Sequence, residues 1–190
     1  MRFKHKLVLP MIMRMYFIAI VLPGELNKKV LRWKNFMHKK FGCNVGLKSP
    51  AHITLIPPFW MHEEREQRLT ADIDDISAYA QPFTIVTKKF SAFKGRTIYA
   101  EVLENEKLKS LKAAIYKFFS AADYKIKTET RPFHPHITIA TRDLHKKDFY
   151  EAWMLFDAKK FMSEWEANTL SVLRHNSTNW EVIHTSAFKM

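Results

Sequence analysis

HITLI at His52–Ile56 and HITIA at His136–Ala140 are almost the same five residues, present twice in one chain. Each stretch is short and rich in apolar and β-branched residues, a composition typical of a strand. In a strand, residues i and i+2 point to the same face. Each stretch therefore predicts a strand that presents an imidazole and a hydroxyl together and turns its isoleucine to the opposite face.

The sequence around these two stretches also repeats in order. AIVLPGEL at Ala19–Leu26 aligns with AEVLENEK at Ala100–Lys107, 81 residues later, and the two HIT stretches lie 84 residues apart. Hydrophobic periodicity and turn residues predict strands at Tyr16–Leu22, His52–Ile56, Phe83–Phe90, Thr97–Leu103 and His136–Ala140, and a final hairpin of Trp165–Arg174 with Trp180–Phe188. The predicted helices are Glu25–Phe41, His62–Ala80, Glu106–Ala122 and Lys146–Phe161. We expect an α+β fold of two duplicated β-α-β-α-β units with pseudo-twofold symmetry.

Length and composition fit one folded domain. The chain has 190 residues, of which 47% are hydrophobic and 26% charged, and it has only four glycines, which excludes disordered and low-complexity classes. The single cysteine, Cys43, excludes an internal disulfide and a cysteine-based zinc site. We expect residues 1–15 to be a non-essential leader and residues 16–190 to form one bilobal domain, with repeats at about 16–92 and 96–190.

The apolar run Met15–Leu22 is far shorter than the about 20 residues that span a bilayer. The basic, apolar start of the chain lacks a signal-peptide cleavage site, and Met11, Met13 or Met15 could be the natural start. We therefore expect a cytoplasmic protein with no membrane association, and nothing in the sequence requires more than a monomer.

Lysine and arginine total 31 against 19 acidic residues, a net charge of +12. Such a surface attracts polyanions such as RNA and nucleotides, although a basic protein with no nucleic-acid role has the same charge. The first predicted helix is strongly basic and forms either a polyanion-steering face or an ordinary solvated face; its cations include Lys28, Lys29, Arg32, Lys34, Lys39 and Lys40.

Two His-x-Thr strands across a pseudo-twofold axis would place His52, Thr54, His136 and Thr138 in a shared cleft. Opening a phosphodiester requires a base for the nucleophile and an acid for the leaving oxygen, and imidazoles with pKa values of about 6.5 serve as both. Threonine hydroxyls can bind the non-bridging phosphate oxygens, where charge develops. This scheme needs no metal and no cofactor. Ordinary surface residues would not explain why both motifs occupy equivalent places in the repeat.

The motifs AHITLIPPF at Ala51–Phe59 and RPFHPHITIATR at Arg131–Arg142 resemble the two signatures of the 2H phosphoesterase superfamily, in the branch of bacterial 2′-5′ RNA ligases (LigT-like proteins). The resemblance implies a bilobal fold with antiparallel-rich sheets around a central cleft. It implies cyclic phosphodiesterase action on RNA ends or nucleotides that carry a cyclic phosphate, and in some members reversible 2′-5′ ligation. It also implies that His52 and His136 are catalytic and that Thr54 and Thr138 bind phosphate.

Three further residues are candidate substrate contacts. Family members often carry an arginine directly after the alanine of the second motif, whereas here Thr141 intervenes and Arg142 follows. In a regular strand this shift turns the arginine to the other face, unless the strand ends or bulges there. Phe59 could stack on a base or belong to the core, and Tyr99 could line the cleft.

Two other hypotheses remain open. His134 and His136 could chelate a metal from a strand, with Glu129 as the nearest carboxylate, although a mononuclear site usually needs a third ligand close by. The same fold could instead be a non-catalytic RNA- or nucleotide-binding module. A similar pattern, His175-Asn176-Ser177, falls in the predicted final turn and is not counted as a site.

Overall fold

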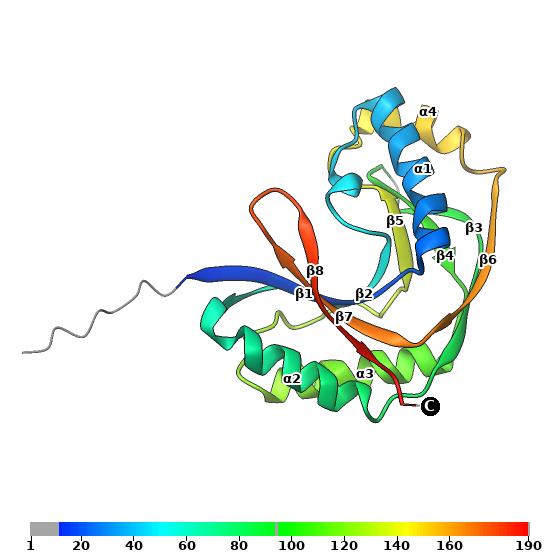
Figure 1. Cartoon of the computed structure of the whole chain (residues 1–190). Helices are drawn as coiled ribbons and strands as arrows, with labels where there is room; N and C mark the ends of the chain where they lie inside the picture. The colour runs from blue at the N-terminus through cyan, green and yellow to red at the C-terminus, as the bar shows by residue number, and fades with distance from the viewer. Residues whose placement is uncertain (1–11, 94, 190) are drawn as a thin grey trace, which may run out of the picture.

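The computed structural model describes residues 12–93 and 95–189, which form two four-stranded sheets with antiparallel neighbours (Figure 1). The first sheet has the order β2 (His52–His62), β1 (Met13–Val21), β7 (Thr169–His175) and β8 (Trp180–Ala187). The second has the order β5 (His136–Ala140), β4 (Thr97–Val102), β3 (Phe83–Phe93) and β6 (Lys160–Ala167). β2 and β5 are therefore both edge strands, and they contact each other.

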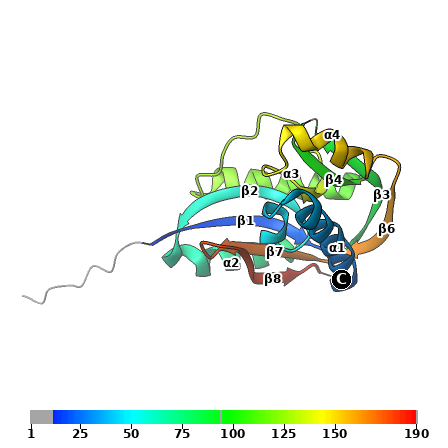
Figure 2. The same cartoon turned by 90° about the horizontal axis from the view of Figure 1, so that it is seen from above.

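Four α-helices cover the sheets. They are α1 (Gly24–Phe41), α2 (Glu66–Ser77), α3 (Glu106–Ala121) and α4 (Lys146–Met154), with short 3-10 helices η1 (Val45–Lys48) and η2 (Glu63–Arg65). Figures 1 and 2 show α2 and α3 beside the first sheet and α1 and α4 beside the second. Trp33 of α1 packs on Phe90 of β3, and Phe119 of α3 packs on Phe59 of β2. The first helix of the first repeat, α1, thus packs on the sheet that contains β4 and β5. The first helix of the second repeat, α3, packs on the sheet that contains β1 and β2.

Each sheet takes strands from both expected repeats. β3 ends the first repeat but pairs with β4 and β6, whereas β7 and β8 end the second repeat and join β1. The strand register also corrects the alignment of the repeats by one residue: Ala19 lies opposite Thr54, and Tyr99 lies opposite Thr138. Ala19 is thus equivalent to Tyr99, whereas the letters matched it to Ala100.

β2 does not end at Pro57 and Pro58 as expected but continues to His62. Proline lacks an N–H donor, and an edge strand tolerates it at positions that face away from the partner strand or at bulges. Here the pairing with β1 skips both prolines, since Tyr16 pairs with Phe59 and Ile18 with Ile56. The prolines therefore form an irregularity that the edge strand accommodates.

The region after α4 also differs from expectation. α4 ends at Met154, and the helix predicted to reach Phe161 is wrong there because Lys160–Ala167 is strand β6. The predicted strand Trp165–Arg174 is divided between β6 and β7, which lie in different sheets. Alternating burial, with Phe161, Trp165 and Ala167 buried, is typical of a strand and explains the difference.

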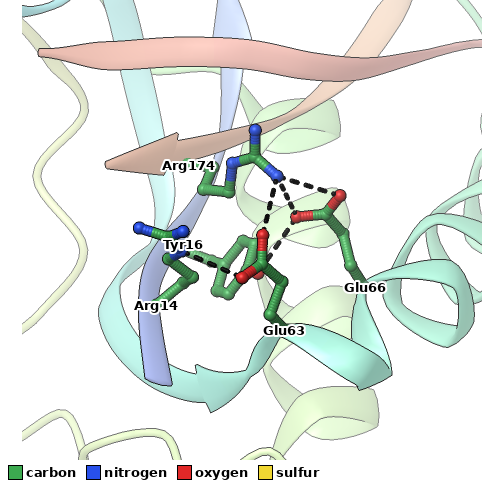
Figure 3. A network of polar contacts seen from close by, with 5 residues as sticks. All are labelled: Arg14, Tyr16, Glu63, Glu66 and Arg174. Carbon is green, nitrogen blue, oxygen red and sulfur yellow. Dashed lines mark hydrogen bonds and ion pairs between the residues drawn. The ribbon is translucent and has the colours of Figure 1, made fainter. Parts of the chain in front are cut away.

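A polar network joins the first sheet to η2 and α2 (Figure 3). Arg174 of β7 contacts Glu66 at 2.9 Å, and the buried Tyr16 donates its hydroxyl to the same carboxylate at 3.0 Å. Burial and Glu66 raise the pKa of Tyr16, so its hydroxyl stays protonated as the donor. Arg14, in the expected leader, contacts Glu63 at 3.2 Å. Residues 1–11 of that leader lie outside the described residues, but Met13–Met15 belong to β1.

The helices of the described ranges do not meet the requirements of a membrane span. None of them combines the length and the apolar character that crossing a bilayer requires.

Candidate active site

The two His-x-Thr motifs meet where the edge strands β2 and β5 approach each other. His52, Thr54 and Thr138 line a cleft of about 530 Å³. His136 borders an adjoining pocket that shares Thr54 and Pro58 with this cleft. The structure therefore brings all four predicted side chains to one region, and the intervening Ile53 and Ile137 are buried in the core.

Both imidazoles are held in the same way. Nδ1 of His52 donates to the carbonyl oxygen of Pro50 at 2.7 Å, and Nδ1 of His136 donates to that of His134, also at 2.7 Å. A carbonyl oxygen only accepts, so Nδ1 must carry the proton in each neutral ring. Nε2 then carries the lone pair and has no described protein partner. Each ring can accept a proton at Nε2, or donate one there once it is protonated.

The pKa of His52 is lowered to about 4, chiefly by burial; the Pro50 carbonyl opposes this change, and the positive charges of Lys34 and His136 add to it. The pKa of His136 is also lowered, mainly by burial; the hydrogen bond to the His134 carbonyl opposes this change, and the charge of the His134 ring adds to it. Burial therefore favours the uncharged form of both rings.

An aromatic ring packs against each motif histidine. Phe17 of β1 lies 4.8 Å from the His52 ring, and Tyr99 of β4 lies 5.1 Å from the His136 ring, measured between centroids. The Tyr99 hydroxyl is also 3.0 Å from Nε2 of His134. Tyr99 is 3% exposed and lines neither pocket, so the structure places it behind His136 rather than at the cleft surface.

Arg142 lines the main cleft. β5 ends at Ala140, and Arg142 adopts a left-handed backbone conformation with φ of 56°, so the alternation of a regular strand no longer sets its direction. The next residue, Asp143, accepts hydrogen bonds from the backbone N–H groups of Asn44 at 2.5 Å and Val45 at 2.8 Å. This contact ties the Arg142 turn to the start of η1.

Phe59 lies elsewhere. It is 3% exposed and packs against Phe119 and Tyr124 beneath the first sheet. Its ring belongs to the core and does not reach the cleft, so we do not include it among the substrate contacts.

Several cleft residues were not among the predicted site residues: Lys34 was named only as a cation of the basic helix, His175 was set aside, and Lys48 and Trp180 were missed. Lys34, Lys48, His175 and Trp180 all line the main cleft, and His175 stands 4.9 Å from Trp180 between ring centroids. His175 is the last residue of β7 rather than part of the turn. Only the pairing of β7 with β1, which the sequence pattern did not predict, brings it to the cleft.

The residues of the metal hypothesis are engaged with other partners. His134 bonds the Tyr99 hydroxyl, and Glu129 bonds Lys112 at 2.5 Å. In the described part of the chain, no three His, Cys, Asp or Glu side chains cluster in a way that could hold a metal ion.

The amino-acid sequence of the chain matches a known protein family. The family model described as the 2′-5′ RNA ligase superfamily matches residues 23–179. The chain belongs to the 2′-5′ RNA ligase superfamily. The resemblance carried by the two motifs is thereby confirmed.

Solved structures confirm the expected α+β, LigT-like fold of this superfamily member. E. coli LigT in complex with 3′-AMP superposes with a TM-score of 0.67 at 17% identity and covers 94% of this chain and 99% of that chain. A protein of Thermus thermophilus gives a TM-score of 0.64 at 17% identity over 92% of this chain and 97% of that chain. At these identities the likeness shows the fold.

Two bacterial relatives are similar in sequence. A provisionally named phosphoesterase of Bacillus pumilus is 30% identical over 118 residues, which cover 61% of this chain and 66% of the relative. The RNA 2′,3′-cyclic phosphodiesterase of Bacillus subtilis is 25% identical over 140 residues, which cover 67% of this chain and 70% of the relative. This superfamily member therefore spans just under two thirds of the length of the first relative.

Proposed function

We propose that this protein is a phosphoesterase that opens 2′,3′-cyclic phosphates of RNA ends or nucleotides by two-histidine acid–base catalysis without a metal or cofactor. The observation that carries the proposal is the pair of imidazoles, each with Nδ1 held by a backbone carbonyl and Nε2 left without a described partner. The cleft wall contains Lys34, Lys48 and Arg142 and no acidic side chain among its described residues, which suits an anionic substrate.

In the proposed reaction, one histidine is neutral and the other is protonated on both ring nitrogens. Nε2 of the neutral ring takes a proton from water as the water oxygen attacks the phosphorus. The bond between the phosphorus and one ribose oxygen breaks, and Nε2 of the protonated ring donates its proton to that oxygen. Thr54 and Thr138 donate hydrogen bonds to the non-bridging oxygens, where negative charge increases in the transition state. In the reverse direction an RNA hydroxyl replaces water, which would join RNA ends through a 2′-5′ linkage.

The comparisons support this substrate class. The Bacillus subtilis relative is named as an RNA 2′,3′-cyclic phosphodiesterase, and E. coli LigT has been crystallised with 3′-AMP. 3′-AMP is the phosphomonoester that results when a 2′,3′-cyclic phosphate of adenosine opens at the 2′ oxygen. The same cleft in this chain would hold such a molecule with its phosphate between the two motifs.

The test is hydrolysis of 2′,3′-cyclic AMP and of an RNA oligonucleotide with a terminal cyclic phosphate, both with a strong chelator present. His52→Ala and His136→Ala should each lower kcat by about 10²–10⁴-fold, because each removes one proton transfer. His38→Ala, on the exposed side of α1, is the matched control and should leave kcat unchanged.

Wild-type protein that binds these ligands without turnover would overturn the proposal in favour of a non-catalytic RNA- or nucleotide-binding module. Loss of turnover in the chelator would point instead to metal-dependent chemistry. Identifying the product as the 2′- or the 3′-phosphate would define the leaving oxygen.

A further inference from the structure

Lys34 is a buried cation in the wall of the cleft. Its side chain leaves α1, is 4% exposed, and lines the cleft together with His52. Its Nζ donates one hydrogen bond, to the carbonyl oxygen of Ser49 at 3.0 Å. An ammonium group has three donors, so two N–H groups remain after this bond.

No described carboxylate pairs with Lys34, which is unusual for a lysine at this depth. Lys112 of α3 provides a comparison within the same chain. It is 6% exposed, and its Nζ contacts Glu129 at 2.5 Å. Among the described residues, the fold therefore supplies a counter-ion for Lys112 and none for Lys34.

Burial without a neighbouring negative charge lowers the pKa of Lys34 to about 8. Its charge is also felt by His52, whose pKa it lowers. An anion that entered the cleft beside His52 would stabilise the charged form of Lys34 and satisfy its free donors. The described residues of the cleft wall include no Asp or Glu that could take this place.

We propose that Lys34 binds a phosphate oxygen of the substrate beside His52, as a charged contact outside the two His-x-Thr motifs. The identity of that substrate rests on the proposed function. Attack by water adds a second negative charge to the single charge of a cyclic phosphodiester once the water proton has been removed. A fixed ammonium group at this point therefore stabilises the transition state and the phosphomonoester product more than the cyclic substrate.

The test is calorimetric titration of inorganic phosphate and of 3′-AMP into the wild-type protein and into Lys34→Met. The Kd of the variant should rise about tenfold or more for both ligands, since a charge-assisted contact is lost. Lys39→Met is the matched control: it removes one exposed charge from the same helix and should change Kd less than about twofold. A Kd for Lys34→Met within about twofold of the wild-type value would overturn the proposal.

A second measurement avoids the variant altogether. The side-chain NMR signal of Lys34 in the wild-type protein should shift on addition of inorganic phosphate, and its pKa should rise. A Lys34 pKa that does not change with saturating phosphate, or wild-type protein that binds no phosphate, would also overturn the proposal.

Chemical denaturation should show Lys34→Met to be at least as stable as wild type, because the variant no longer buries an unpaired charge.

These outcomes separate the two proposals. Turnover of cyclic phosphates with phosphate binding that does not depend on Lys34 would overturn the role of Lys34 and leave the proposed function standing. Phosphate binding that depends on Lys34, in a protein that does not open cyclic phosphates, would support the role of Lys34 and overturn the proposed function.

Discussion

Each motif histidine is oriented by the carbonyl group two residues before it. Pro50 and His134 supply these acceptors, and both lie just outside their strands, where the carbonyl is not used by the sheet. The bond fixes the tautomer with Nδ1 protonated, so the proton-transfer atom of both rings is Nε2. One side-chain-to-backbone bond of 2.7 Å at each ring thus gives the two histidines, on edge strands of different sheets, the same tautomer.

The lowered pKa values predict the pH dependence of the reaction. Because burial lowers the pKa of both His52 and His136, kcat/KM should follow a bell whose centre lies below about pH 6.5. The limbs report macroscopic values shared by the pair. The check is kcat/KM for 2′,3′-cyclic AMP over a pH series at constant ionic strength. A flat profile, or a bell centred above about pH 7, would contradict this prediction, provided that the chemical step limits turnover.

At the scale of elements, the cleft depends on the close approach of η1 to β5. Gly46 of η1 lies against the backbone of β5, and a Cβ added to it would lie 2.5 Å from the carbonyl oxygen of Ile139. Asp143 reinforces the approach by accepting the N–H groups of Asn44 and Val45. Because glycine has no side chain, η1, which lines the cleft, can pack directly on β5, the strand that carries the second motif.

Gly46→Ala should force η1 away from β5. We expect the free energy of unfolding to fall by about 1–3 kcal/mol, as for other overpacked sites, together with a loss of kcat/KM. Urea denaturation and the cyclic phosphate assay measure the two effects. Gly24→Ala is the control, because a Cβ there meets nothing within 4 Å. Equal stability of the two variants would show that η1 is not held at the distance described.

At the scale of the whole molecule, charge and shape act together. The chain carries a net charge of +12, and the cleft gathers Lys34, Lys48 and Arg142 where the edge strands of the two sheets meet. Positive potential focused in a concave site raises the local concentration of anions and the rate of their association. Some of the basic residues thus lie in the cleft itself, and the others contribute to the positive charge of the molecule as a whole.

Salt should therefore weaken the reaction in proportion to the charge of the substrate. We expect kcat/KM to decrease as salt concentration increases, and to decrease more steeply for an RNA oligonucleotide with a terminal cyclic phosphate than for 2′,3′-cyclic AMP. Parallel assays over a salt series measure both slopes. Equal slopes would mean that the basic surface does not contact the RNA beyond its terminal nucleotide.

Features that depend on neighbours along the chain could be predicted from the amino-acid sequence. β5 was predicted to the residue at His136–Ala140, and the alternation of strand side chains placed each histidine on the same face as its threonine. The repeat also indicated two equivalent strand pairs. These predictions succeeded because strand alternation and helix periodicity are local properties of the backbone.

Which strands share a sheet, and which side chains reach the cleft, became known from the three-dimensional fold. β7 and β8 end the second repeat in sequence but pair in the sheet of β1 and β2, and this pairing brings His175 and Trp180 to the site. The packing of α1 on the second sheet buries Lys34 in the wall of the cleft. Phe59, close to a motif in sequence, lies in the core because α3 covers its face of the strand. Sequence distance does not fix these outcomes, because they are set by contacts between segments far apart in the chain.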